Sequence, residues 1–196
     1  MNIRKARITE KDAISTLIME AMDAECCQYL AGPEHTLEDF HYLISQLVAE
    51  EETLYSYRNT LVAIDSNGQV AGACVSYDGA DFQRLRRPFI QKAKKVFNID
   101  HSQMKEETHA GELYVDSLCV AEPFRHQGIA TALLKATAAK AYRLGISTVG
   151  LLVDQGNPGA ERLYRSLGFR YAEDTSWAGH PMRHLVQKVT ETAGNS

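Results

Sequence analysis

Residues 120–130 read Val-Ala-Glu-Pro-Phe-Arg-His-Gln-Gly-Ile-Ala, and this stretch contains the strand-to-helix transition that decides the fold. An apolar strand ends at Val120, Pro123 forces a turn, and a helix is predicted to begin directly after it. The first turn of a helix has unpaired N–H groups and the positive end of the helix dipole, so it binds anions well. The small Gly128 and Ala130 would let a phosphate approach this backbone. The same pattern also fits a tight turn that uses small residues for packing.

Hydrophobic periodicity on either side of this stretch predicts an antiparallel first half and a β-α-β-α-β second half. Expected strands cover residues 3–8, 60–64, 70–77, 112–120, 148–153, 169–173 and 183–190. Expected helices cover residues 13–30 with Thr9 as N-cap, a segment capped by Thr36, and residues 84–107, 127–144 and 157–167. Asp65 to Gly68 has the composition of a hairpin turn. Without an internal repeat or linker, this indicates one mixed α/β (α+β) domain over residues 1–190.

Bulk composition is that of an ordinary globular protein. The 196 residues are 44% hydrophobic and 23% charged, with a net charge of -4, which argues against nucleic-acid or membrane partners. A basic run lies between Arg84 and Lys95, but the acids that follow it favour a solvated helix face. Four cysteines at these spacings indicate no disulfide framework, so we expect a reduced, cytoplasmic protein. Seven histidines lack metal-ligand spacing, so no metal is expected.

Two segments together carry a family resemblance. Residues 125–130, Arg-His-Gln-Gly-Ile-Ala, fit the R/Q-x-x-G-x-G/A signature of the GNAT acetyltransferase superfamily. Residues 157–169 resemble that family's N-x-x-A-x-x-x-Y-x-x-x-G-F segment, in the family's order and at a suitable separation. The resemblance implies a mixed central sheet, flanked by helices and splayed near the end of the 112–120 strand, with acetyl-CoA as cosubstrate.

The resemblance also assigns roles to residues of this chain. Backbone amides of Arg125, His126, Gln127, Gly128, Ile129, Ala130 and Thr131 would hold the CoA pyrophosphate. Leu118, Cys119 and Val120 would lie along the pantetheine arm, and Asn157 and Ala160 would contact the same cofactor. Tyr164 matches the position that often protonates the leaving thiolate, although its helical stripe also suits a core tyrosine.

Two carboxylates, Asp116 and Glu112, are candidates for the catalytic base. An alkyl amine has a pKa of about 10, so it arrives protonated and needs a base before it can attack a thioester. If the strand alternates regularly, Glu112, Tyr114 and Asp116 share one face with Leu118 and Val120, and Cys119 faces away from Asp116. Asp116 matches a base proposed for small-amine relatives, whereas histone-type relatives carry their glutamate where Tyr114 stands. Glu112 lies nearer the expected acceptor entrance.

The reaction expected from the resemblance is direct transfer of acetyl to a primary amine of a small molecule in a ternary complex. A protein N-terminal or lysine acetyltransferase and a non-catalytic CoA-binding sensor are the alternatives. We expect the charged insert at residues 78–110 to help form the acceptor-site wall, with a lid or dimer contact equally compatible. The family also leads us to expect a homodimer, and residues 191–196 are predicted to form a flexible tail.

Overall fold

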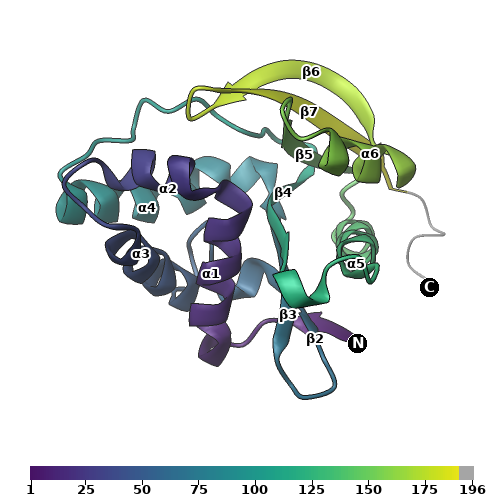
Figure 1. The fold of residues 1–196 in the computed structure, drawn as a ribbon. Helices are drawn as coiled ribbons and strands as arrows, with labels where there is room; N and C mark the ends of the chain where they lie inside the picture. Colours follow the sequence, from purple (N-terminus) through teal and green to yellow (C-terminus); the bar gives the residue numbers. More distant parts are fainter. Residues whose placement is uncertain (190–196) are drawn as a thin grey trace.

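One seven-stranded mixed sheet organises the chain, with strand order β1-β2-β3-β4-β5-β7-β6 (Figure 1). The computed structural model describes residues 1–189, so the predicted tail at 191–196 lies outside the described residues. The strands are β1 (Asn2–Lys5), β2 (Thr60–Ile64), β3 (Val70–Asp78), β4 (Leu113–Val120), β5 (Thr148–Asp154), β6 (Arg170–Trp177) and β7 (His180–Lys188). All neighbours are antiparallel except β4 and β5, which run parallel. The predicted mixed α/β fold class is confirmed.

The predicted β2–β3 hairpin turn is confirmed. The Asp65 carboxylate accepts hydrogen bonds from the backbone N–H groups of Asn67 and Gln69, at 2.9 and 2.8 Å. Gly68 has φ +82°, a conformation that glycine adopts without steric cost. The turn residues therefore fix the register of the hairpin locally.

Four helices cover one face of the sheet: α1 (Lys11–Met22), α2 (Ala24–Ala31), α3 (Leu37–Ala49) and α4 (Phe82–Phe97) (Figure 1). The single helix predicted over 13–30 is wrong, because Asp23 has φ +70° and its carboxylate caps α2 through the N–H of Cys26. Thr9 is not the N-cap of α1, because it lies inside a 3-10 turn over Ile8–Glu10 and Glu10 holds the cap position of α1. The predicted cap at Thr36 is confirmed, since its hydroxyl accepts the N–H of Asp39.

Helix α4 is shorter than the predicted 84–107 helix and ends at Phe97, where Asn98 adopts a left-handed conformation. Its predicted apolar stripe packs into the core, with Leu85, Phe89, Ala93 and Phe97 buried and Ile90 partly buried. The buried Arg86 on this helix donates hydrogen bonds to the carbonyls of His101 and Met104. This guanidinium therefore holds the irregular segment 98–112 against the helix.

Helices α5 (Ile129–Arg143) and α6 (Pro158–Ser166) lie on the other side of the sheet, where they enclose a second apolar core (Figure 1). No helix within residues 1–189 combines the length and apolarity needed to cross a bilayer.

Strands β4 and β5 diverge after a short paired region. Their register joins Leu113, Tyr114 and Val115 only to residues 149–151, although β4 runs on to Val120 and β5 to Asp154. Backbone groups on this edge of β4 therefore have no β5 partner beyond residue 115. The predicted splay near the end of β4 is thus present, and it opens the sheet beside the α5 turn.

Candidate active site

A cavity of about 520 Å³ lies where β4 and β5 diverge. Its walls come from the α1–α2 junction, β4, the end of β5 and the β6–β7 turn. Its charged lining residues are Glu20, Asp23, Glu107, Asp116 and Asp154, with His180 as the one basic side chain of this lining. Tyr55, Tyr114 and Trp177 supply aromatic surface. A cationic molecule therefore suits this cavity better than an anionic one.

Two carboxylates, Glu107 and Asp116, share the cavity and are each held by a tyrosine. The Tyr114 hydroxyl donates to Glu107 at 3.1 Å, and the Tyr77 hydroxyl donates to Asp116 at 2.7 Å. Ser117 donates a further hydrogen bond to Asp116 at 2.9 Å. The two tyrosine rings pack edge to face with centroids 5.8 Å apart, so the two carboxylates are positioned as a unit.

Both carboxyl groups are shifted toward the protonated form. Burial, followed by the charge of Asp116, raises the pKa of Glu107 to about 8. Burial also raises the pKa of Asp116, although hydrogen bonds from Tyr77 and Ser117 oppose that shift. The indole Nε1 of Trp177 lies near Glu107 but forms no hydrogen bond within the described residues. The pair therefore retains a proton at neutral pH and offers a site that can exchange it.

Glu107 makes the stability of the fold depend on pH. Its pKa is about 8 in the folded chain against an ordinary glutamate value of 4.5, so the folded state binds an extra proton between these pH values. Stability is then expected to fall as the pH rises through this interval. Glu107→Gln removes the buried charge and should raise Tm at about pH 9 by about 2–4 °C, the effect of about 1 kcal/mol. Calorimetry from about pH 5 to 9 tests this, and parallel wild-type and variant curves would contradict it.

Strand β4 does not alternate regularly, so the predicted face shared by residues 112, 114, 116, 118 and 120 is wrong beyond Asp116. Val75 of β3 pairs with Ser117 and Ser76 pairs with Val115, which leaves Asp116 as an extra residue in a bulge. Beyond the bulge, Leu118 and Val120 pack against the core under α5, whereas Tyr114 lies in the core under α1. Cys119 also packs on the α1 side, so it does not face away from Asp116.

Glu112 lies in a different environment from Asp116. It is buried over Gly150 of β5, where Thr108 donates to one carboxylate oxygen at 2.6 Å and His184 contacts the other at 2.9 Å. It lines a separate cavity of about 360 Å³ whose other walls come from β5, β6 and β7. The structure thus brings Asp116 and Glu107 together and does not bring Glu112 to them.

The turn before α5 has the geometry of an anion site. His126 and Gly128 have positive φ values of 62° and 77°, and the first helical bond of α5 runs from the Ala132 N–H to the carbonyl of the N-cap residue Gly128. The N–H groups of Ile129, Ala130 and Thr131 consequently have no partner within the helix. Arg125 binds the Val120 carbonyl and Glu20, so it fixes the turn against the end of β4.

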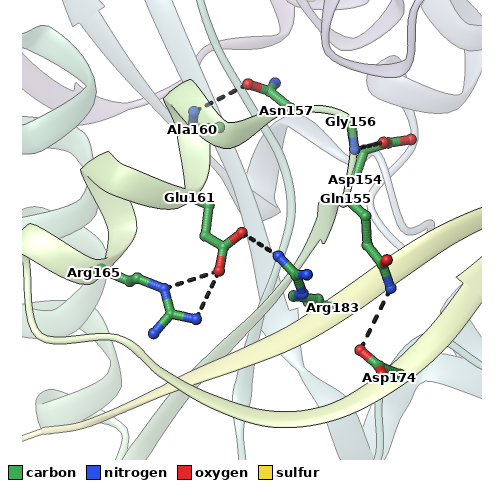
Figure 2. A network of polar contacts seen from close by, with 9 residues as sticks. All are labelled: Asp154, Gln155, Gly156, Asn157, Ala160, Glu161, Arg165, Asp174 and Arg183. Carbon is green, nitrogen blue, oxygen red and sulfur yellow. Dashed lines mark hydrogen bonds and ion pairs between the residues drawn. The ribbon is translucent and has the colours of Figure 1, made fainter.

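Helix α6 places Asn157 beside the cavity. The Asn157 side chain accepts the N–H of Ala160 at 3.0 Å and so caps the helix (Figure 2). Further along, the Glu161 carboxylate binds both Arg165 of α6 and Arg183 of β7, and the first of these bonds is the main cause of its lowered pKa (Figure 2). This pairing fastens the helix to β7. Asn157 lines the cavity, whereas Ala160 packs against the core under α5.

The Acetyltransferase (GNAT) family model matches residues 19–169, which include the α5 turn, Asp116 and α6. This chain belongs to the GNAT acetyltransferase family.

Relatives of known structure agree with this assignment to the GNAT family. A crystal structure described as an acetyltransferase is 30% identical with a TM-score of 0.78, covering 97% of this chain and 100% of the other. An N-acetyltransferase from Staphylococcus aureus Mu50 has the same fold, with 20% identity, a TM-score of 0.81 and coverage of 95% and 100%.

A curated relative is GCN5-related N-acetyltransferase 4, chloroplastic, from Arabidopsis thaliana, which is 39% identical over 105 residues. That match covers 54% of this chain and 31% of the Arabidopsis protein, so the chain aligns with about a third of that relative's length.

Tyr164, the acid expected from the GNAT resemblance, lies on α6 beside Phe169, with ring centroids 5.9 Å apart. Burial raises its pKa to about 12, so the hydroxyl keeps its proton at neutral pH. It packs against the core under α5 and is not among the residues that line the cavity.

Glu107 is the site residue that the sequence did not single out. It belongs to the irregular segment 98–112, which the charge pattern assigned to a helix, and Arg86 anchors part of that segment. From the predicted acceptor-site wall at 78–110, Glu107 is the residue that reaches the cavity lining. One of two adjacent glutamates in a charged run, Glu107 carries no sequence signal that it lines a cavity.

Proposed function

We propose that this chain transfers the acetyl group of acetyl-CoA directly to a primary amine of a small cationic molecule. The observation that carries this is the Glu107–Asp116 pair, which faces a cavity lined by acids where the sheet splays. A protonated amine is attracted there, and an ionised carboxylate can then remove its proton. Asp116 is the proposed base, because it occupies the bulge next to the unpaired edge of β4.

In the proposed complex, the pyrophosphate binds the N–H groups of residues 126–131 and the pantetheine arm runs along the unpaired edge of β4. Asn157 and Ala160 would contact this arm from α6. A backbone N–H at the β4 edge would polarise the thioester carbonyl, and Tyr164, which stays protonated, would protonate the departing thiolate. Asp116 would first take one proton from the ammonium group, and the neutral amine would then attack the carbonyl carbon. As the C–S bond breaks, Tyr164 would give its proton to the thiolate, and the second proton lost by the amine nitrogen would restore the Tyr164 hydroxyl through solvent.

Direct transfer is favoured over a cysteinyl intermediate. Cys119 lies on the α1 side near Glu20, at 3.5 Å from its carboxylate. Burial raises the pKa of this thiol to about 11, so little thiolate exists at neutral pH. Because the thiolate is the nucleophilic form, Cys119 is a poor acyl carrier. A homodimer and a cytoplasmic location remain predictions from the sequence.

An acceptor screen tests the proposed substrate class. Release of free CoA thiol would be measured with di- and polyamines, with neutral and zwitterionic amines, and with peptides. We expect kcat/KM for the cationic amines to exceed that for neutral amines at least about tenfold, equivalent to about 1.4 kcal/mol. Better turnover of peptides would favour a protein acetyltransferase. Binding of acetyl-CoA without thiol release with any acceptor would favour a sensor.

A further inference from the structure

A second polar cluster lies apart from the proposed catalytic pair, around Glu112. His109, Glu112 and His184 each offer one ligand atom, and these atoms lie within 4.8 Å of one another. His109 and Glu112 belong to the segment entering β4, whereas His184 lies on β7, 72 residues from Glu112 in the chain. Sequence spacing could not link them, because the pairing of β5 with both β4 and β7 brings them together.

Each of the three side chains offers one ligand atom toward the cluster and has a neighbour beside its other polar atom, and the ligand atoms of Glu112 and His184 now contact each other. His109 Nδ1 is 3.0 Å from the Ala110 carbonyl, which leaves Nε2 available. Thr108 donates to Glu112 Oε1 at 2.6 Å, which leaves Oε2. His184 Nδ1 lies 3.8 Å from a Glu173 carboxylate oxygen, and its Nε2 faces Glu112 Oε2. Metal-binding histidines in proteins are oriented by outer partners of this kind.

The cluster can close around a tetrahedral divalent ion by side-chain movement, since its ligand atoms lie within 4.8 Å of one another and His109 is exposed. Zn–N and Zn–O bonds of about 2.0 Å at a tetrahedral angle require about 3.3 Å between ligand atoms. His184 Nε2 and Glu112 Oε2 are 2.9 Å apart, so they would separate by a few tenths of an ångström. His109 is exposed, and the cavity of about 360 Å³ beside it gives solvent access to a fourth position.

Two glycines make room for the cluster. An added Cβ at Gly150 of β5 would overlap the Glu112 carboxylate, and one at Gly79 would overlap the His109 carbonyl. The Gly79 N–H also bonds the Glu112 carbonyl at 2.9 Å, which holds the backbone between the two ligands. The ligands therefore sit on backbone that is fixed before any ion arrives.

We propose that His109, Glu112 and His184 form a site for a divalent transition-metal ion of the zinc type, with one coordination position open to solvent. Two imidazoles and one carboxylate are a donor set typical of zinc-type ions, whereas Mg²⁺ and Ca²⁺ are bound through oxygen atoms. The bound ion would tie the segment 98–112 to β7. The ion would thereby fix the segment that carries Glu107. The proposed metal site does not depend on the acetyl-transfer proposal.

Titration calorimetry of the chelator-treated protein with Zn²⁺ tests the site. One ion per chain is expected, with a rise in Tm because the ion binds only the folded state. His109→Ala should weaken binding at least about tenfold, since even outer-shell changes cost about 10–100-fold in metal affinity. His109 is exposed, so this variant is expected to fold.

His41→Ala is the matched control. His41 lies on α3, bonded to Thr16 of α1, and has no part in the cluster. Its replacement should leave stoichiometry and affinity unchanged. Absence of Zn²⁺ binding to the wild type would overturn the proposal. Equal weakening by both variants, or none by His109→Ala, would also overturn it, because the ion would then bind elsewhere.

Discussion

Acetyl-CoA is expected to bind at least about 100-fold more weakly once Gly128 is replaced by glutamate, a loss of about 2.7 kcal/mol. The new carboxylate would stand at the start of α5, where we propose that the pyrophosphate accepts hydrogen bonds from the first-turn N–H groups. Like charges forced together in a binding site cost several kcal/mol. A Cβ at Gly128 meets no protein atom within 4 Å, so the substitution causes no clash within the fold. Titration calorimetry measures the effect.

Gly145→Glu provides the matched control. Gly145 has φ +72° against +77° for Gly128, and a Cβ there also meets nothing within 4 Å. It follows the other end of α5, a helix of 15 residues and therefore about 22 Å long. Both variants should lose about 1 kcal/mol of stability from the positive φ, whereas only Gly128→Glu should lose acetyl-CoA. Equal affinities for the two variants would show that the anion does not bind at the α5 turn.

Features of the fold that depend on local chemistry were predictable from the sequence. Asp65 and Gly68 form the expected hairpin turn, and Asn157 caps α6 as its position before Pro158 suggests. The α5 turn is also where the sequence places it, because a proline and a glycine bracket it. In each case the residue that begins or ends the helix or strand affects backbone groups only a few positions away in the sequence.

Features that depend on distant pairing were not predictable. The bulge at Asp116 exists because β3 and β4 pair on either side of it, and nothing between residues 113 and 120 marks an extra residue. Strict alternation of side chains between the two faces of the sheet fails as a prediction there, because one inserted residue moves every later side chain to the opposite face. Glu107 and His184 join their clusters only through the folded segment 98–112 and the β5–β7 pairing.

Asp116→Asn is expected to lower kcat by about 100–1,000-fold, the usual contribution of a general base. The amide keeps an oxygen that can accept the Tyr77 hydrogen bond, so the fold should be preserved. Affinity for acetyl-CoA should stay within about twofold of the wild type, because the α5 turn is unchanged. Steady-state kinetics with the best acceptor and calorimetry with acetyl-CoA measure the two quantities separately.

The proposed base is distinguished from its partner by comparing Asp116→Asn with Glu107→Gln. If Asp116 takes the amine proton and Glu107 only shares the site, Glu107→Gln should cost about tenfold or less in kcat. Asp116→Asn removes a charge that raises the pKa of Glu107, so the pH dependence of stability assigned to Glu107 should shift toward lower pH. A larger loss of kcat in Glu107→Gln would make Glu107 the base. A loss of less than about tenfold in both variants would contradict base catalysis by this pair, because a general base contributes at least about 100-fold.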